Sequence, residues 1–525
     1  MRIAITGATG NMGREVMKQI ISLEEAEEFR CLSRSAKNLD GLCKLLKKHL
    51  KKTGGDTSNV NKITRLSGSL SSPEVCEKLI DGVDYVLAIG AVIPPQADQN
   101  PKSAIDCNEH GTDALVSAIE AKENQPKLLH VSTMALYGNR NSRHPWGRVG
   151  DPLLISPFDV YAATKMRGEF RVMNSKVKTW AVIRQSAMLH DNMLSGNISD
   201  GLMFHTCFNA PLEWVTAHDS GVLVRRILER DLAGELDETN FWKKCFNIGG
   251  GESNRLIGYD TLNDGFKMIG GTAKNFFKPY YNATRNFHGL WFTDGDELNK
   301  LFGYVEQDST AYWKHIAKLH PVYGMGKIVP KALIASFVIK PLLKNYNAPA
   351  YWASHGDEAR LTAYFGGRDK YEALPEKWND FPLLSEGKDE WGEPIDYERL
   401  RTTPTEIDYG FDFSKADGDI DISDLRSVAA YHGGKLLSED FVKGDMHAPV
   451  KWLTQDGEEF TATPYSVLRA GHWYNISYKE YAWDFDRLAK KDKLYAQIWY
   501  DSHGKVEDVF YFLDENFKSH TRESK

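Results

Sequence analysis

A tyrosine and a lysine four residues apart, Tyr161 and Lys165, could form an acid/base pair. On a helix, positions i and i+4 share one face, so the phenol and the ammonium would lie side by side. A free tyrosine has a pKa of about 10, too high for proton transfer at neutral pH, and a nearby cation favours the phenolate and lowers that pKa. The same spacing also occurs on ordinary solvated helix faces, so the surrounding elements must decide between the two interpretations.

A glycine-rich loop near the N-terminus could hold phosphates. The segment TGATGNMG has glycines at positions 7, 10 and 13, after an apolar run at 2–6 and before a helical pattern at 11–22. One glycine of such a loop makes the turn, one lets the backbone approach a pyrophosphate, and one lets helix and strand pack closely. Free N–H groups at the helix N-terminus then bind the anion. The predicted dinucleotide-binding residues are Thr6, Gly7, Thr9, Gly10, Asn11, Met12 and Gly13.

The end of the second predicted strand, 29–33, indicates which dinucleotide is bound. Ser33 and Arg34 occupy this end, where a site selective for NAD usually carries an acid for the ribose hydroxyl. A guanidinium suits a 2′-phosphate, because it can donate two parallel hydrogen bonds to an anion. The sequence therefore favours NADP(H), with NAD(H) as the alternative. The competing interpretation is that Arg34 is a solvated loop residue.

The order of apolar runs predicts the architecture that positions these groups. Strand-like runs at 2–6, 29–33, 84–90, 127–132, 180–184 and 244–250 alternate with helical patterns. This alternation is typical of an α/β fold, a Rossmann-type doubly wound parallel sheet. After about residue 304 the chain reads as helices broken by proline and glycine, and then as short β-like segments at 450–454, 459–465, 494–501 and 506–513. We expect a nucleotide-binding and substrate domain at 1–310, a helical extension with a linker at 311–425, and a small α+β module at 426–525.

Composition argues against several classes of partner, although it does not exclude a small basic patch. The formal net charge is -7, which argues against nucleic acid or a membrane held through bulk charge. The apolar run 332–339 is too short to span a bilayer, and the N-terminus reads as a first strand rather than a signal peptide. The six cysteines include no C-x-x-C pair, so we expect neither a disulfide framework nor a thiolate metal site. We therefore expect a reduced, cytoplasmic setting.

Several motifs in order resemble the extended short-chain dehydrogenase/reductases, the NAD-dependent epimerase/dehydratase group, over about residues 1–305. After the glycine loop come DGVDYVLAIGA, CNEHGT, HVSTMALYG, VYAATKMRGE, WAVIRQSAML and CFNIGGGE. The resemblance implies that Tyr161 exchanges a proton with the substrate oxygen, that Lys165 also holds the nicotinamide ribose, and that Thr133 hydrogen-bonds the substrate oxygen. It implies a supporting role for Asn108, and a cofactor path along the backbone at Ala88 and Gly90. With these motifs present, the catalytic interpretation of Tyr161 and Lys165 is favoured.

Two departures from the family pattern obscure the substrate. The usual Gly-Asp after the third strand is Gly68-Ser69, and the usual Arg-Pro is Arg184-Gln185. Pocket walls in this family come from about 186–220 and 255–295. These ranges carry here His190, Asn192, Met203, Phe204, His205, Trp214, Phe287, His288 and Trp291.

A fainter resemblance connects about residues 426–480 with a treble-clef zinc module. The positions of its cysteines hold Thr454, Tyr474 and Ser477, and a tetrahedral zinc site needs four Cys or His ligands. We therefore expect no metal here and a module held together by Trp452, Phe460 and Trp473.

Three functions remain open at this point. The leading one is an NADP-dependent oxidoreductase that acts on a carbonyl/alcohol pair of a small organic substrate. The alternatives are a nucleotide-sugar epimerase or dehydratase with retained NAD, and a non-catalytic NADP-sensing or scaffold protein. A homodimer is expected from the family, unless the C-terminal addition replaces the dimer contact.

Overall fold

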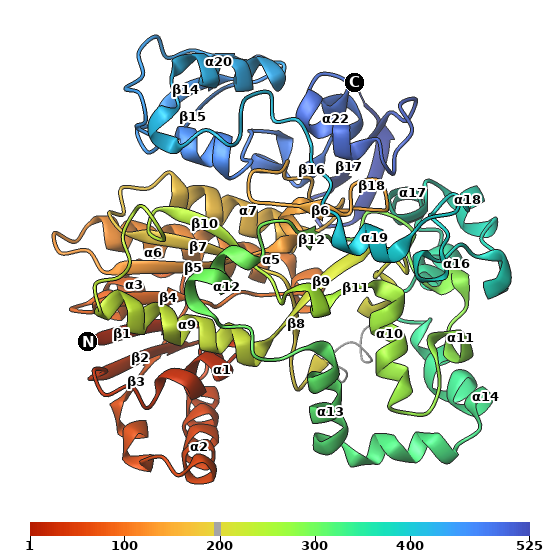
Figure 1. Cartoon of the computed structure of the whole chain (residues 1–525), viewed down its shortest axis with the longest axis horizontal. Coiled ribbons are helices and arrows are strands. Elements are labelled where there is room, and N and C mark those ends of the chain that lie inside the picture. Colours follow the sequence, from red (N-terminus) through yellow and green to blue (C-terminus); the bar gives the residue numbers. More distant parts are fainter. Residues whose placement is uncertain (194–200, 525) are drawn as a thin grey trace.

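The computed structural model describes residues 1–193 and 201–524. Its centre is a seven-stranded sheet in the order β10-β7-β5-β4-β1-β2-β3, with every neighbouring pair parallel (Figure 1). The strands are β1 (Arg2–Thr6), β2 (Glu28–Ser33), β3 (Ile63–Ser67), β4 (Tyr85–Ala88), β5 (Lys127–Thr133), β7 (Trp180–Gln185) and β10 (Lys244–Ile248). The predicted Rossmann-type sheet is confirmed, because each of the six apolar runs forms one of these strands.

Helices cover both faces of the sheet. One face packs against α1 (Asn11–Ile20), α2 (Ala36–Thr53) and α9 (Ala217–Leu232). The other packs against α3 (Pro73–Ile80), α6 (Gly111–Glu120) and α7 (Val160–Met173). The central strands β1, β4 and β5 are buried on both sides, which explains why they read as continuous apolar runs rather than as alternating ones.

The substrate part adds two small sheets beside the carboxyl ends of the central strands. One has the order β11-β9-β8 and the other pairs β12 with β6. Their bounds are β6 (Trp146–Gly147), β8 (Ala187–Leu189), β9 (Pro211–Thr216), β11 (Arg255–Ile257) and β12 (Trp291–Phe292), with helices α10 (Gly258–Lys267), α11 (Ala273–Phe276) and α12 (Asp296–Phe302).

A helical extension follows the substrate part. It consists of α13 (Ser309–Leu319), η7 (Pro321–Ile328), α14 (Lys331–Ile334), η8 (Ala335–Ile339), α15 (Lys340–Leu342), α16 (Pro349–His355), α17 (Glu358–Phe365), α18 (Arg368–Glu372) and α19 (Tyr397–Thr402). Within the described residues, no single helix is long and apolar enough to cross a membrane. One pair bent by 118°, Pro321–Ile328 with Lys331–Leu342, meets the length and composition criteria only when the two helices are taken together.

The C-terminal module holds two three-stranded sheets, β13-β14-β15 and β16-β17-β18. Its elements are α20 (Ile422–Tyr431), β13 (Lys435–Leu436), β14 (Val450–Leu453), β15 (Glu459–Ala462), β16 (Ala482–Trp483), α21 (Phe485–Ala489), α22 (Lys493–Trp499), β17 (Val509–Leu513) and β18 (Ser519–Glu523). The β-like interpretation of 494–501 is wrong, because most of this segment lies in α22. The Asp492 side chain accepts hydrogen bonds from the N–H groups of Leu494 and Tyr495 and so starts a helix there.

The module packs directly on the sheet domain. The hydroxyl of Tyr465 accepts a hydrogen bond of 2.7 Å from the backbone N–H of Cys245, in the edge strand β10. One continuous apolar cluster includes residues of α6 and α7 together with Trp452, Trp473 and Trp483. The sheet domain and the C-terminal module therefore share one hydrophobic core, although they lie far apart in the sequence.

Candidate active site

A cavity of about 570 Å³ lies where the carboxyl ends of the central strands meet the substrate part. The glycine loop after β1 lines one end, and the helical extension lines the other. In open α/β sheets this edge is where ligands bind, because the strands deliver their loops to it. Most of the predicted site residues line this cavity.

The glycines of the loop are required by close backbone contacts. Gly7 has a φ of +74°, and a Cβ added there would lie 2.4 Å from the Cα of Gly90. A Cβ on Gly13 would lie 2.1 Å from the carbonyl oxygen of Gly7. At Gly10 the nearest heavy atom is that same oxygen, at 3.3 Å, and Gly10 lines the cavity as the N-cap of α1. The first turn of α1 has no acidic residue. This geometry fits a pyrophosphate, because backbone N–H groups and a helix N-terminus face the cavity unobstructed.

The other predicted dinucleotide contacts fall into two groups. The residues that line the cavity are Thr6, Thr9, Asn11, Met12, Ser33, Arg34 and Gly90, whereas Ala88 lies in β4 behind the loop and does not. The hydroxyl of Thr6 accepts a hydrogen bond of 3.1 Å from the N–H of Gly90, which ties the β1 and β4 ends together. The exposed Arg34 donates to Ser103 Oγ at 3.2 Å.

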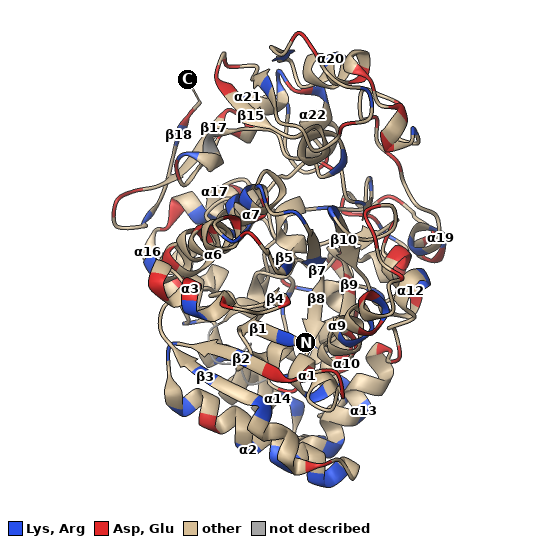
Figure 2. Ribbon diagram, turned by 90° about the vertical axis from the view of Figure 1, so that its left-hand side faces the viewer, with Lys and Arg blue, Asp and Glu red and all other residues tan. Residues whose placement is uncertain are grey.

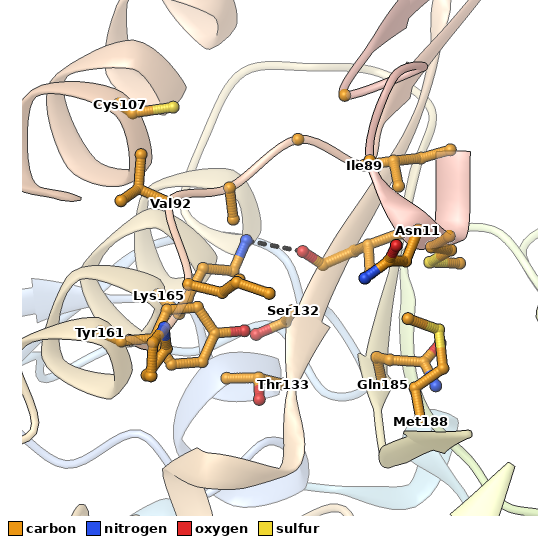
Figure 3. Close-up of a pocket in the computed structure, with 18 of the residues that line it drawn as sticks. Asn11, Ile89, Val92, Cys107, Ser132, Thr133, Tyr161, Lys165, Gln185 and Met188 are labelled. Atoms are coloured by element: carbon orange, nitrogen blue, oxygen red, sulfur yellow. Dashed lines mark hydrogen bonds between the residues drawn. The ribbon is translucent and has the colours of Figure 1, made fainter. Parts of the chain in front are cut away.

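Thr133, Tyr161 and Lys165 converge at the middle of the cavity (Figure 3). Thr133 ends β5, and the other two lie one turn apart on α7, whose first turn is capped by the Asp159 carboxylate at 2.9 Å from the N–H of Ala162. Figure 3 shows the phenol of Tyr161 pointing toward Ser132 and Thr133, with Lys165 alongside. The Lys165 ammonium donates to the carbonyl oxygen of Val131 at 2.6 Å.

Burial dominates the protonation of both α7 residues. It raises the pKa of Tyr161 to about 12, against the opposing effect of the Thr133 side chain. It lowers the pKa of Lys165 to about 8, against the opposing effects of Cys107 and Glu169. The expected lowering of the tyrosine pKa by the lysine is therefore not met in this arrangement, since the ammonium is bonded to a carbonyl of β5. The phenol is protonated at neutral pH and is placed to donate.

Asn108 supports the site without lining it. Its side-chain oxygen accepts a hydrogen bond of 2.8 Å from the N–H of Val92, and its amide donates to the Val92 carbonyl at 2.9 Å. The amide also donates to Thr164 Oγ on α7 at 3.1 Å. Asn108 thus fixes the loop after β4 against the helix that carries Tyr161 and Lys165.

The far end of the cavity combines the predicted walls with residues from the extension. His190, His205, Phe287 and His288 line it, whereas Met203, Phe204, Trp214 and Trp291 do not, and residues 194–200 of the predicted wall lie outside the described part of the chain. Asn347, Arg360 and Tyr364 complete the lining. No sequence motif predicts these three residues, because they lie beyond the boundary of the family resemblance.

Several buried polar atoms around the cavity have no hydrogen-bond partner within the described residues. They are Ser132 Oγ, Ser156 Oγ, Ser186 Oγ, His190 Nδ1, His205 Nε2 and Asn347 Oδ1. Burial lowers the pKa of His205 to about 3 and that of His288 to about 4, so both imidazoles are neutral. An unpaired polar atom in such a place is costly unless a ligand satisfies it, so this end of the cavity suits a substrate with several hydrogen-bonding groups.

The C-terminal module contacts the helix that carries the site. Arg184 and Glu169, both fully buried, form an ion pair of 2.5 Å beneath the cavity, and His472 Nε2 lies 2.9 Å from the same carboxylate. Burial alone would raise the pKa of Glu169, but the guanidinium and the imidazole outweigh it and hold that pKa well below its usual range. The Arg184-Gln185 departure from the family motif thus leaves an arginine that joins α7, β7 and the module.

The three positions that correspond to cysteines of a treble-clef zinc module have structural roles here. Thr454 Oγ accepts from two backbone N–H groups of the β14–β15 turn, and Ser477 Oγ donates to the carbonyl of Ala482 at 3.0 Å. Tyr474 stacks on Phe460 with ring centres 5.6 Å apart. The rings of Trp452, Phe460 and Trp473 are buried against one another, as predicted for the core of the module.

Comparison with known proteins bears on the first third of the chain. Residues 3–176 match the model of the NAD dependent epimerase/dehydratase family. Fatty acyl-CoA reductase wat from Drosophila melanogaster is 26% identical over 153 residues, which cover 27% of this chain and 29% of that protein. The chain thus matches less than a third of the length of this relative.

Three solved structures with a similar fold illustrate the likeness. A short-chain dehydrogenase/reductase superfamily protein from Agrobacterium tumefaciens with bound NAD is 16% identical, covering 61% of this chain and 98% of that one, with a TM-score of 0.43. DesIV, a dTDP-glucose 4,6-dehydratase from Streptomyces venezuelae, is 18% identical over 62% of this chain and 99% of that one, with a TM-score of 0.45. UDP-glucose 4-epimerase from Bifidobacterium longum is 13% identical over 62% and 100%, with a TM-score of 0.44.

The family match ends just beyond α7, so it spans the glycine loop, Thr133, Tyr161 and Lys165. These residues line one cavity. Residues 3–176 thus resemble the NAD dependent epimerase/dehydratase family, and this match covers about the first third of the chain.

Proposed function

We propose that the protein is an NADP(H)-dependent oxidoreductase that interconverts a carbonyl and an alcohol of a small organic substrate. The observation that carries this proposal is the meeting of Thr133, Tyr161 and Lys165 in one cavity with the glycine loop and Arg34. A protein that only binds the nucleotide does not need a protonated phenol aimed at the space beside it. The relative named as a reductase supports this reaction class, but only for the matched part, 27% of this chain.

The residues of the chain would hold the dinucleotide along the cavity. The N–H groups at the start of α1 would bind its pyrophosphate, and Arg34, with Ser33 beside it, would bind a 2′-phosphate. The strand end carries no acid that would repel that phosphate. When bound, the nicotinamide supplies or accepts the hydride.

The proton steps then belong to Tyr161. In the direction of reduction, its phenolic O–H donates the proton to the substrate oxygen as that oxygen gains charge, and Thr133 Oγ donates a hydrogen bond to the same oxygen. Once released from its bond to the Val131 carbonyl, the Lys165 ammonium on the same helix face would stabilise the tyrosinate that remains. In the direction of oxidation the tyrosinate takes the proton back. Asn108 keeps the loop after β4 and α7 in register throughout.

The substrate is held at the far end by groups from two parts of the chain. His205, Asn347 and the serine hydroxyls offer unpaired hydrogen-bonding atoms, and Tyr364 and Phe287 offer ring surfaces. A small polar substrate with an apolar portion fits this lining. A reduced, cytoplasmic setting is part of the proposal, because all six cysteines are free.

The nucleotide found in the purified protein tests the proposal. We expect an exchangeable site that binds NADPH more tightly than NADH, followed by turnover in a panel of carbonyl substrates. Tightly retained NAD would instead favour the epimerase or dehydratase, which returns the hydride to its own substrate. Binding of neither nucleotide would contradict both enzymes.

A further inference from the structure

The helical extension exposes an unusual concentration of large apolar side chains. Residues 319–344, from here on the apolar hairpin, run from the end of α13 through η7 and α14 to just beyond α15. Of the large hydrophobic side chains exposed in the described chain, eight of fourteen lie in it. Ile328 is 83% exposed and Phe337 is 74% exposed, although isoleucine and phenylalanine are usually buried in a protein core. The eight are Leu319, Val322, Met325, Ile328, Val329, Leu333, Phe337 and Val338.

The hairpin is fixed to the protein by its opposite side. Ile339 is buried in the cluster that contains Phe276 and Trp378, and Ile334 and Leu342 pack against it. Ile316 and Trp313 of α13 are buried in a neighbouring cluster. One face of the hairpin therefore anchors it, and the other presents its apolar side chains outward, so its exposure does not come from a missing core.

The charged side chains of the hairpin's own segment have one sign. Residues 309–356 contain six lysines and no aspartate, glutamate or arginine, although the whole chain has a net charge of -7. The lysines are exposed, and none forms an ion pair within the part of the chain that the structure describes. They are Lys314, Lys318, Lys327, Lys331, Lys340 and Lys344. The whole chain is negatively charged, but the segment that carries the exposed apolar side chains is positively charged.

A second basic element lies at the same end of the molecule. Helix α2 carries six exposed lysines and one acid, Asp40, which pairs with Arg65. In Figures 1 and 2 this helix and the segments α13 and α14 lie at the lower end, away from the C-terminal module. Lysines of two separate elements therefore lie at the same end of the molecule as the apolar hairpin.

We propose that the apolar hairpin inserts into the surface of a membrane rich in anionic lipids. Apolar side chains fringed by lysines are the signature of elements that lie in the interface, with rings and aliphatic groups below the headgroups and ammonium groups among the lipid phosphates. The 118° bend between its two helices suits a shallow wedge rather than a span. A partner protein would have to supply a large acidic groove, whereas an anionic bilayer offers both required properties everywhere on its surface.

Vesicle flotation with the full-length protein tests this inference. We expect the protein to float with vesicles of phosphatidylcholine and phosphatidylserine, and much less with phosphatidylcholine alone. Replacing both Ile328 and Phe337 by aspartate should abolish flotation, and Lys327→Glu with Lys331→Glu should reduce the partition by roughly tenfold or more. NADPH binding, measured in parallel, should stay unchanged in all these variants, which separates this inference from the proposed function.

Two substitutions in the C-terminal module serve as controls, and three results would overturn the inference. Val506→Asp and Lys505→Glu change equally exposed residues in the C-terminal module and should leave flotation intact. Wild-type protein that stays with neither kind of vesicle would overturn the inference. So would self-association that the Phe337→Asp change abolishes in the absence of lipid, because the apolar face would then be a contact between copies of the chain. Flotation retained after the Ile328 and Phe337 changes would also refute it.

Discussion

Nε2 of His472, in the C-terminal module, lies 2.9 Å from Oε1 of Glu169, on the helix that carries Tyr161 and Lys165. Both side chains are fully buried, and Nδ1 of the same imidazole lies 2.5 Å from the Tyr478 hydroxyl. Burial lowers the pKa of His472. A neutral imidazole therefore donates to the carboxylate through Nε2 and accepts from the tyrosine through Nδ1. The module is thereby joined to the back of the catalytic helix.

Replacing His472 by alanine should destabilise the whole chain. The change removes a hydrogen bond to a buried charge and leaves a void beside α7, at a cost of about 2–4 kcal/mol. Denaturant unfolding followed by tryptophan fluorescence measures this loss. His520→Ala, in the same module but 44% exposed at the side chain, should have little effect. Equal effects of the two changes would show that the contact with Glu169 contributes nothing particular.

The glycine loop gives a sharp steric prediction. A Cβ at Gly13 would lie 2.1 Å from the carbonyl oxygen of Gly7, so Gly13→Ala must displace the loop or α1. We expect nucleotide binding, measured by fluorescence titration or calorimetry, to fall below detection. Gly41→Ala is the control, because a Cβ there meets no atom within 4 Å and alanine favours the helix. Unchanged affinity in Gly13→Ala would mean that the dinucleotide does not use this loop.

Arg34 should determine the choice between the two nucleotides. Its guanidinium lines the cavity at the end of β2 and has only a serine hydroxyl as a hydrogen-bond partner in the described structure. Arg34→Ala should weaken NADPH binding by about tenfold or more, the value of a hydrogen-bonded charge, and leave NADH affinity nearly unchanged. Direct titration of both nucleotides measures the ratio. A parallel loss of both affinities would remove Arg34 from the role of 2′-phosphate ligand.

The parts of the structure that the sequence predicts are the locally encoded ones. The glycine loop, Tyr161 and Lys165 each lie in a short segment whose neighbours form the strand or helix that the spacing indicates. His472 lies 303 residues from Glu169 in the sequence, and Asn347 enters the cavity from beyond the family resemblance, so no local pattern records either placement. The segment 494–501 was misread as β-like because its aromatic residues suit strands, whereas its Asp492 cap and the spacing of Leu494 and Ile498 favour a helix.

Asn347 should contribute to substrate binding alone. Its Oδ1 is buried at the far end of the cavity and has no partner within the described residues, and the backbone carbonyl of the same residue faces His205. Asn347→Ala should raise KM for the best carbonyl substrate by about tenfold, with NADPH affinity preserved. Steady-state kinetics with a direct NADPH titration separates the two effects. Unchanged KM would indicate that the extension only covers the cavity.

Tyr161 and Lys165 make a prediction that depends on pH. Because burial lowers the pKa of Lys165 to about 8, the ammonium is present below that pH and is lost as the pH rises through it. The charge that would stabilise the tyrosinate during turnover is lost with it, so the rate of carbonyl reduction should decline above a pH of about 8. Lys165→Met should remove this decline together with most of the activity. Tyr161→Phe should abolish turnover and keep NADPH binding, since it deletes only the proton donor, whereas turnover preserved in that variant would leave the chain as a nucleotide-binding regulator.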